Sequence, residues 1–546
     1  MKFDTILKQN LRQNWFFPIS ASAYFCLNAT TLKYLLGLPI AFLATAIIAA
    51  RSESLFFYSK AASLSLKLFS ALTAAGICWG GRDAFIRIWS TSSKVRALTQ
   101  ILPISVDIIS FVGVFGAVCA FFSVFLCLLF FWKHFVRLIL DTDAFKNMSM
   151  QEWIIYSFLL TITLVFVSFI FLQTDAFYAT EFNYDIIYTS DSPMLVKQNV
   201  YLSFAHGEND LRQPLFSLFS APFIGLPFLV GKVFQLPASV SALLMNYVQI
   251  LLLFATNFML TRLMDLSATK RICFMLLSCC TYTQILSVLM MEQYIFAYFW
   301  LILCVFQLCK QDRADEFVLF GAGGTLLTSF ALLPFSTGYS PLSNFKAWFK
   351  PVWQTGVKFC ILMLIFCRLD VFLSLFTKLS SLFQYTGRDV AFTEKFYQYT
   401  TFLHNCFLAP DAGLSYSNKE FVSWQLVETN SVCYAGVLIL FLATLSVYLN
   451  RDKRISLYCG GWAFFSLVIL FVLGWGTQEN GLILYSLYFA WAFFVLLFQL
   501  LEKITQCAAH SFLFPFLCLV CSGVLLIANI PAAKELLHFA VTYFPL

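Results

Sequence analysis

Long segments of about twenty residues with almost no charge recur along the chain and limit what it can fold into. A helix that crosses a bilayer needs about 20 consecutive apolar residues. Of the 546 residues, 60% are hydrophobic and only 12% are charged, whereas a water-soluble domain carries about 25% charged residues. These values exclude a soluble globule, a disordered chain and a secreted disulfide scaffold. The sequence therefore predicts an all-α, polytopic membrane protein with about a dozen spans.

The apolar segments differ in strength. The strong ones lie at 34–50, 108–132, 152–173, 238–261, 272–290, 293–309, 351–377, 432–449, 457–474, 481–501 and 511–529. Weaker ones lie at 15–31, 61–80 and 317–335. The basic N-terminus shows no small-residue cleavage site before Lys33, so we expect a retained first span rather than a signal peptide.

Basic residues gather in short clusters between the apolar segments. The clusters are Lys133, Arg137 and Lys146; Arg262, Lys270 and Arg271; Lys310 and Arg313; and Arg451, Lys453 and Arg454. Cytoplasmic loops of membrane proteins carry such an excess of lysine and arginine. The clusters account for the net charge of +7 without nucleic acid as a partner. They also orient the 152–173 span outward, so the acidic stretch that follows it is expected to be external.

The same topology divides the chain into four regions. They are N-terminal membrane helices of undecided topology (1–150), a transmembrane core (151–377) with an external loop (174–237), an external aromatic-rich loop (378–430) and C-terminal transmembrane helices (431–546). The N-terminal region allows either a hairpin at 101–132 or an interfacial helix at 61–80. Within the core, we expect 215–235 to be an external juxtamembrane helix broken by Pro222 and Pro227, and 317–345 to be a re-entrant pair of short helices.

The external loop contains the most informative sequence. It reads Tyr188-Thr-Ser-Asp191-Ser-Pro, then Asn199-Val-Tyr-Leu-Ser-Phe-Ala-His-Gly, then Asn209-Asp-Leu-Arg-Gln-Pro214-Leu-Phe. This order resembles the first external loop of the GT-C superfamily of integral membrane glycosyltransferases, of the polyprenyl-phosphate-sugar-dependent, family 39-like kind. The resemblance covers roughly 150–310. One departure is Gln213-Pro214, where the family usually shows His-Pro or Arg-Pro.

The resemblance implies a GT-C-like helical bundle with external juxtamembrane helices. It also implies an enzyme that transfers a hexosyl or pentosyl group from a polyprenyl-phosphate-linked donor at the outer face. The acceptor, a glycan, a lipid or a protein, is left open. Such a protein belongs to the cell envelope, and we expect it in a bacterial cytoplasmic (inner or plasma) membrane with the lipid bilayer as a partner.

Asp191 occupies the motif position of the general base, and Asp185 is the second candidate. A carboxylate near the membrane boundary loses solvation, which raises its pKa and helps it to act as a base. An aspartate before Ser-Pro is also a common turn or helix-capping residue, and this alternative stays open.

Four further residues are candidates for substrate binding. Glu292 separates two apolar runs at a junction where the family often places an acidic residue that supports the donor or a metal, so a divalent cation is one possible cofactor. Arg212 is the best partner for a leaving phosphate, because a phosphate needs a cation. Asp210 lies in the same external loop as Arg212. Glu479 lies in the short external turn from Gly474 to Gly481, from which it could line the same cavity. The alternative for each is a solvated polar residue of a loop.

Other functions stay open on the sequence alone. A transporter or flippase of lipid-linked saccharides would show internal repeats and charges near the middle of the membrane. An envelope polysaccharide polymerase or ligase would depend on external Arg212, Arg388, His206 and His404. The sequence contains no P-loop, nucleophile elbow, zinc-protease or dinucleotide motif.

The 378–430 segment is rich in aromatic residues, which suit membrane anchoring or a lid over the site. Cys406 and Cys433 flank a probable external loop and could form a disulfide, although unpaired cysteines are the favoured interpretation. Most of the 17 cysteines lie inside apolar runs and are expected to pack as small hydrophobic residues.

Overall fold

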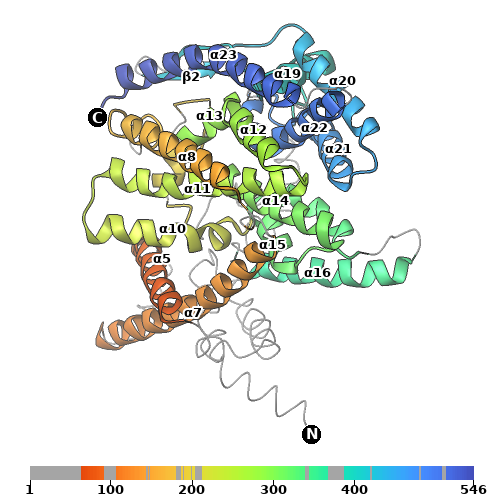
Figure 1. Ribbon diagram of the computed structural model, residues 1–546. Coiled ribbons are helices and arrows are strands. Elements are labelled where there is room, and N and C mark those ends of the chain that lie inside the picture. The colour runs from red at the N-terminus through yellow and green to blue at the C-terminus, as the bar shows by residue number, and fades with distance from the viewer. Residues whose placement is uncertain are drawn as a thin grey trace.

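The computed structural model describes most of the chain beyond residue 62. The described residues are 63–91, 106–142, 146, 148–179, 186–188, 190–197, 199–202, 212–338, 344–366, 386–417, 421–478, 481–506 and 512–546. They form a bundle of helices with one small antiparallel hairpin (Figure 1).

The helices follow one another with short connections. The first half contains α5 (Leu64–Thr91), α7 (Val106–Asp141), α8 (Met150–Phe171), α9 (Ser192–Lys197), α10 (Phe216–Val233), α11 (Ala238–Leu263), α12 (Ala268–Cys279), α13 (Tyr282–Leu289) and α14 (Tyr294–Gln311). The second half contains α15 (Glu316–Thr325), the 3-10 helix η3 (Leu327–Phe335), α16 (Phe345–Phe366), α19 (Phe392–Asn405), α20 (Tyr434–Leu449), α21 (Arg454–Ser466), the π-helical turn η5 (Leu467–Val472), the 3-10 helix η6 (Leu482–Tyr485), α22 (Ser486–Gln506) and α23 (Leu513–Tyr543). The hairpin pairs β1 (Ala412–Ser417) with β2 (Phe421–Leu426).

Within the described residues, eight helices are long and apolar enough to cross a bilayer, or nine if the bent pair α12–α13 forms one span. Helix α8 illustrates why. It begins with a capping box in which Ser149 and Glu152 satisfy each other's backbone amides, and it then presents large apolar side chains such as Phe158 and Phe169 outward. Exposed apolar faces of this length are stable only in lipid. The chain is therefore an integral, multi-pass membrane protein, as predicted.

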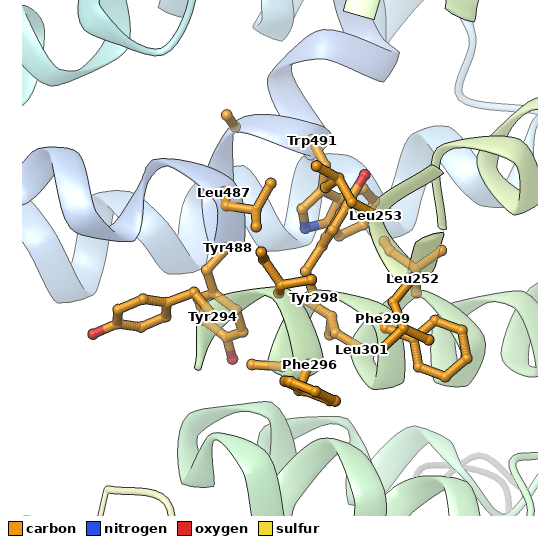
Figure 2. Packing of buried hydrophobic residues seen from close by; sticks show 14 of the residues in the cluster. Leu252, Leu253, Tyr294, Phe296, Tyr298, Phe299, Leu301, Leu487, Tyr488 and Trp491 are labelled. Atoms are coloured by element: carbon orange, nitrogen blue, oxygen red, sulfur yellow. The ribbon is translucent and has the colours of Figure 1, made fainter. Parts of the chain in front are cut away.

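The core is built around α14. Every residue from Tyr294 to Leu308 is buried, because α11, α15 and α22 pack on different sides of this helix. Figure 2 shows the side chains of α14 between leucines of α11 and residues of α22 such as Tyr488 and Trp491. A helix that is apolar on all sides belongs in the centre of a bundle, so this burial follows from the sequence of α14.

Helix α10 corrects one prediction. Pro222 and Pro227 do not break the 215–235 segment, which forms one continuous helix that passes the same length and hydropathy test as the other spans. A proline removes one backbone donor and favours a kink. Here the turns around Pro222 are buried against α5 and α11, and neighbouring helices make prolines tolerable in membrane helices.

Two other segments differ from simple expectations. Helix α7 is continuous over 36 residues from Val106 to Asp141, which excludes a hairpin turn within 106–132, one of the two alternatives for this region. The apolar run 272–290 is not one straight helix, because α12 and α13 meet at Cys280 and Thr281 with a bend of 67°. At the break, Asn529 of α23 donates to the carbonyl of Cys280. Asn529 also donates to the carbonyl of Phe407, which accepts from the backbone amide of Tyr282 at the start of α13.

Ion pairs join the basic clusters at one end of the bundle, which we call the basic end. Lys270 and Lys453 both pair with Glu502, at 2.6 and 3.6 Å. Other ion pairs at this end, among the described residues, include Lys310–Asp265, Arg454–Asp312, His134–Asp315, Arg271–Glu152 and Lys358–Glu316. The clusters predicted to share one side of the membrane therefore do lie together.

The α15–η3 segment has the shape expected of a re-entrant pair. Its two ends meet at the basic end, where the amide of Ala314 donates to the carbonyl of Ser336. Its tip lies inside the bundle, where Leu327 N–H donates to the carbonyl of Arg212 and Leu215 N–H to that of Gly324. Gly321 permits this insertion, since a Cβ there would lie 2.5 Å from the Trp300 ring.

The 378–430 segment is more ordered than an irregular loop, because it contains α19 and the hairpin. Tyr399, Phe402 and Trp424 are buried in the protein core, whereas Phe392 and Tyr416 are exposed. The buried aromatics therefore serve packing rather than membrane anchoring. Cys406 and Cys433 are both free, so no disulfide joins them.

Candidate functional site

Asp191, Arg212 and Glu292, which come from three distant parts of the sequence, meet in one cluster. The backbone amide of Asp191 donates to Glu292 Oε1 at 3.0 Å. Glu292 is buried, while Asp191 and Arg212 are half-buried. The Glu292 carboxyl group therefore lies against the backbone of the loop that carries Asp191. We call these three residues the acid cluster.

Neutral side chains hold the acid cluster in position. Gln293 Nε2 donates to Asp191 Oδ2 at 3.2 Å. Gln249 of α11 accepts from the backbone amide of Glu292 at 3.1 Å and donates to the Tyr201 hydroxyl at 3.0 Å. Through these bonds α11 fixes the α13–α14 junction, and the junction fixes Asp191. Sequence analysis missed these three supporting residues, whose only signal was a glutamine inside the apolar run of α11 and the Glu-Gln pair at the junction.

The backbone around Arg212 is fixed from the opposite side. Its carbonyl accepts from Leu327 at the tip of the α15–η3 pair at 2.8 Å, and α10 begins four residues later, at Phe216. The positive charge of Arg212 favours the ionised form of Asp191. A cation and two carboxyl groups therefore lie at one site, where three elements of the bundle converge.

Burial raises the pKa of the Asp191 carboxyl above its ordinary value of 3.8. The loss of solvation penalises the charged form. Arg212 and the Gln293 hydrogen bond act in the opposite direction, but they only partly offset the effect of burial. A carboxyl group with a raised pKa is a stronger base once it is ionised, which suits proton transfer.

A strained turn precedes Asp191. Tyr188 has a φ of 51°, in the left-handed region that costs about 1 kcal/mol or more for a residue with a Cβ. The turn is held by Trp424 of β2, which accepts from Tyr188 N–H and donates its own N–H to Ile186. The Tyr188 hydroxyl also lies 2.8 Å from that of Tyr282. The aromatic hairpin thus supports the loop that carries Asp191.

The acid cluster lies at the end of α14 opposite the basic end. Helix α14 begins directly after Gln293 and ends at Gln311, next to Lys310 and its pair with Asp265. Its 18 residues span about 26 Å, which is close to the thickness of about 30 Å of a hydrocarbon core. Polar groups at both ends of a buried apolar helix are expected where the helix crosses one bilayer.

Three predicted site residues, Asp185, Asp210 and Glu479, lie outside the described residues, as does His206. His404 is described, and its ring is hydrogen-bonded to the neighbouring Asn405 at 3.1 Å. Arg388 lies next to Gly387, whose amide donates to Gly474. The structure therefore brings together half of the predicted site residues.

The acid cluster provides two carboxyl groups for a metal. Among the described residues, no three His, Cys, Asp or Glu side chains gather closely enough to hold an ion. Magnesium sites often use one or two carboxylates together with water and substrate phosphate, so two carboxyl groups are compatible with a cation that a phosphate substrate helps to bind.

A second polar cluster lies farther along α11, about 12 Å towards the basic end. Asn257 donates to Gln284 and accepts from Tyr298, at 3.1 and 2.8 Å. These side chains and Trp491 line a cavity of about 20 Å³, which has room for one or two water molecules. This cluster connects the bent pair α12–α13 with α11 and α14.

Comparison with known proteins leaves the site to be interpreted from its own geometry, because no family model, curated protein or solved structure matches the chain.

Proposed function

We propose that the protein is a membrane glycosyltransferase that transfers a sugar from a polyprenyl-phosphate-linked donor to an acceptor at the outer face of the membrane. The observation that carries the proposal is the acid cluster. A carboxyl group whose pKa is raised by burial, a second carboxyl group and a cation lie together, about one bilayer thickness from the basic loops. The GT-C-like motif order led to the same three residues.

The chemistry assigns each residue a task. Asp191 accepts the proton of the attacking acceptor hydroxyl, and Arg212 compensates the charge of the leaving polyprenyl phosphate. Glu292 holds the backbone of Asp191 and keeps the loop in place. The glycosidic bond to the phosphate oxygen breaks as the bond to the acceptor oxygen forms. The proton moves to Asp191 and the negative charge to the phosphate.

The positive-inside rule supports the orientation. The joined basic clusters would face the cytoplasm, which directs the acid cluster to the outer face. A substrate with a long isoprenoid tail reaches such a site laterally from the bilayer, while an acceptor approaches from the aqueous side. The half-buried Asp191 suits a site that is open to both.

The decisive test is glycosyl transfer by the purified, reconstituted protein with polyprenyl-phosphate sugars as donors. Asp191→Asn is expected to lower the rate by about 10²–10⁴-fold, the usual contribution of a general base. Asp265→Asn, which removes an exposed carboxyl at the basic end, is the matched control and is expected to keep full activity. Equal rates for both variants would refute the assignment of Asp191.

The orientation has a separate test. Asn430 and Asp452 are both exposed, after the hairpin and at the basic end, respectively. In intact cells, an impermeant maleimide is expected to label Asn430→Cys, and to label Asp452→Cys only after permeabilisation, each above the background of the parent chain. The reverse pattern would contradict the outer-face site.

A carrier or flippase of lipid-linked saccharides is the second candidate. Two interrupted elements favour it, because the bent pair α12–α13 ends three residues before Glu292 and the α15–η3 tip contacts the backbone of Arg212. Interrupted helices around ionisable groups are typical of transporter sites. Movement of a labelled lipid-linked saccharide across vesicles without sugar transfer would favour this function over the enzyme.

A further inference from the structure

The first half of α16 carries an aromatic stripe and two lysines on its outer surface. Phe345, Phe349 and Trp353 follow one another at a spacing of four residues, and their rings stack at 5.5 and 6.1 Å. They are 59, 45 and 62% exposed. Residues four apart lie on the same helix face, so the stripe is continuous over more than two turns.

Lys346 and Lys350 flank this stripe, each directly after one of its aromatic residues. Both are exposed, and within the described part of the chain neither makes an ion pair. Lys358 is different, because it pairs with Glu316 at 2.7 Å. The two outer lysines therefore leave their charges available to a partner.

Helix α16 lies at the basic end of the bundle. Trp348 Nε1 donates to the carbonyl of Pro334, at the end of η3, at 2.7 Å. Almost three turns farther on, Lys358 pairs with Glu316 at the start of α15. The second half of the helix is more apolar and enters the bundle, where Phe359 stacks on Phe330 at 4.1 Å. Figure 1 shows α16 as a long helix along the edge of the bundle.

We propose that the surface formed by Phe345, Lys346, Phe349, Lys350 and Trp353 binds anionic phospholipid headgroups in the leaflet at the basic end. Aromatic side chains favour the headgroup level of a bilayer, and lysines beside them attract anionic lipids. Helix α16 is 22 residues long, yet it is not among the helices that pass the test for a simple span. Helix α16 fails this test because its first half lies at the membrane–water interface and does not cross the bilayer.

Hydrogen bonds through η3 connect the proposed lipid-binding surface of α16 with the acid cluster. Trp348 is bonded to the end of η3, and the beginning of η3 is bonded to Arg212. Headgroup binding would fix α16 against η3 and so steady the segment that positions Arg212. This route offers a physical reason for an enzyme or carrier to respond to the lipid composition of its membrane.

Native mass spectrometry of the full chain in detergent tests the proposal, with phosphatidylglycerol and phosphatidylcholine as probes. The parent chain is expected to retain phosphatidylglycerol preferentially. The double variant Lys346→Gln, Lys350→Gln should bind it at least about tenfold more weakly, since each lysine near the surface contributes about 1 kcal/mol. Phosphatidylcholine binding should not change, and added inorganic phosphate should not displace the lipid.

Lys232→Gln is the matched control. Lys232 is also an exposed lysine beside an aromatic ring, 5.5 Å from that of Phe228, but it lies on α10. This variant should retain phosphatidylglycerol like the parent chain. Unchanged retention by the double variant would refute the proposal, and so would an equal loss of both lipids. Loss of a dimer without loss of lipid would assign the surface to a second copy of the chain.

Discussion

The buried carboxyl groups at the two ends of the bundle differ in how their charge is compensated. At the basic end, Glu152 is fully buried and receives two hydrogen bonds from the Arg271 guanidinium, at 2.5 and 2.8 Å. At the other end, Asp191 is held by the amide group of Gln293, and burial outweighs the effect of Arg212 on its pKa. A directly paired carboxylate has a fixed charge, whereas a carboxyl group with a raised pKa can exchange a proton. The comparison separates a structural charge from a chemical one.

The largest expected effect concerns the structural pair. Arg271→Met leaves Glu152 as a buried, uncompensated charge and should lower the free energy of unfolding by about 3–5 kcal/mol. Reversible unfolding in mixed detergent micelles measures this value. The double variant Glu152→Gln, Arg271→Met should recover much of the loss, since glutamine keeps the capping box with Ser149. A single variant as stable as the parent chain would show that the pair contributes little.

The second-largest effect is expected from Gln249, which supports the acid cluster. Gln249→Leu removes the acceptor of the Glu292 amide and the donor to Tyr201, and a buried polar group that loses its partner costs about 1–3 kcal/mol. Catalysis should fall as well, because the junction that positions Asp191 loosens. Tyr201→Phe breaks only one of the two bonds and is expected to have a smaller effect. Equal effects would mean that Gln249 acts through Tyr201 alone.

Because the pKa of Asp191 is raised, both the free energy of unfolding and the activity should depend on pH. The folded state binds the proton more tightly than the unfolded state, so this stabilisation is complete below the ordinary value of 3.8 and is lost as the pH rises through the raised pKa. Within this window, the parent chain should lose up to about 1.4 kcal/mol per pH unit relative to Asp191→Asn. Activity should rise over the same window, because the base must be ionised. Parallel stability curves would contradict the shift.

The smallest effect is expected from a long ion pair at the basic end, in which the lysine is partly exposed and the glutamate is buried. Lys453 lies 3.6 Å from Glu502, which already has a closer partner in Lys270. Lys453→Gln should therefore lower the free energy of unfolding by less than about 1 kcal/mol, and added salt should reduce the difference further. A larger loss would show that the ion pairs at this end act as one network.

Particular residues show how far sequence reasoning reached. Asp191 and Arg212 could be selected because they lie in the external loop whose motif order resembles that of GT-C glycosyltransferases. Glu292 could be selected because it also separates two strongly apolar runs. Gln249 and Tyr201 could not, since a glutamine inside an apolar run and a tyrosine in a loop have no distinctive spacing. The prolines of α10 were misread for a related reason: a proline indicates a missing backbone donor, but not whether neighbouring helices compensate for it.

Hydrophobicity and charge are properties of single residues added along the chain, so the sequence by itself determined the membrane class, the helical fold and the grouping of the basic loops. The tertiary structure decided which polar groups meet. The contact between Asp191 and Glu292 joins residues 101 positions apart, and the support from Gln249 depends on how α11 packs beside the α13–α14 junction. Such contacts depend on helix packing, whose angles and depths are fixed by many side chains acting together.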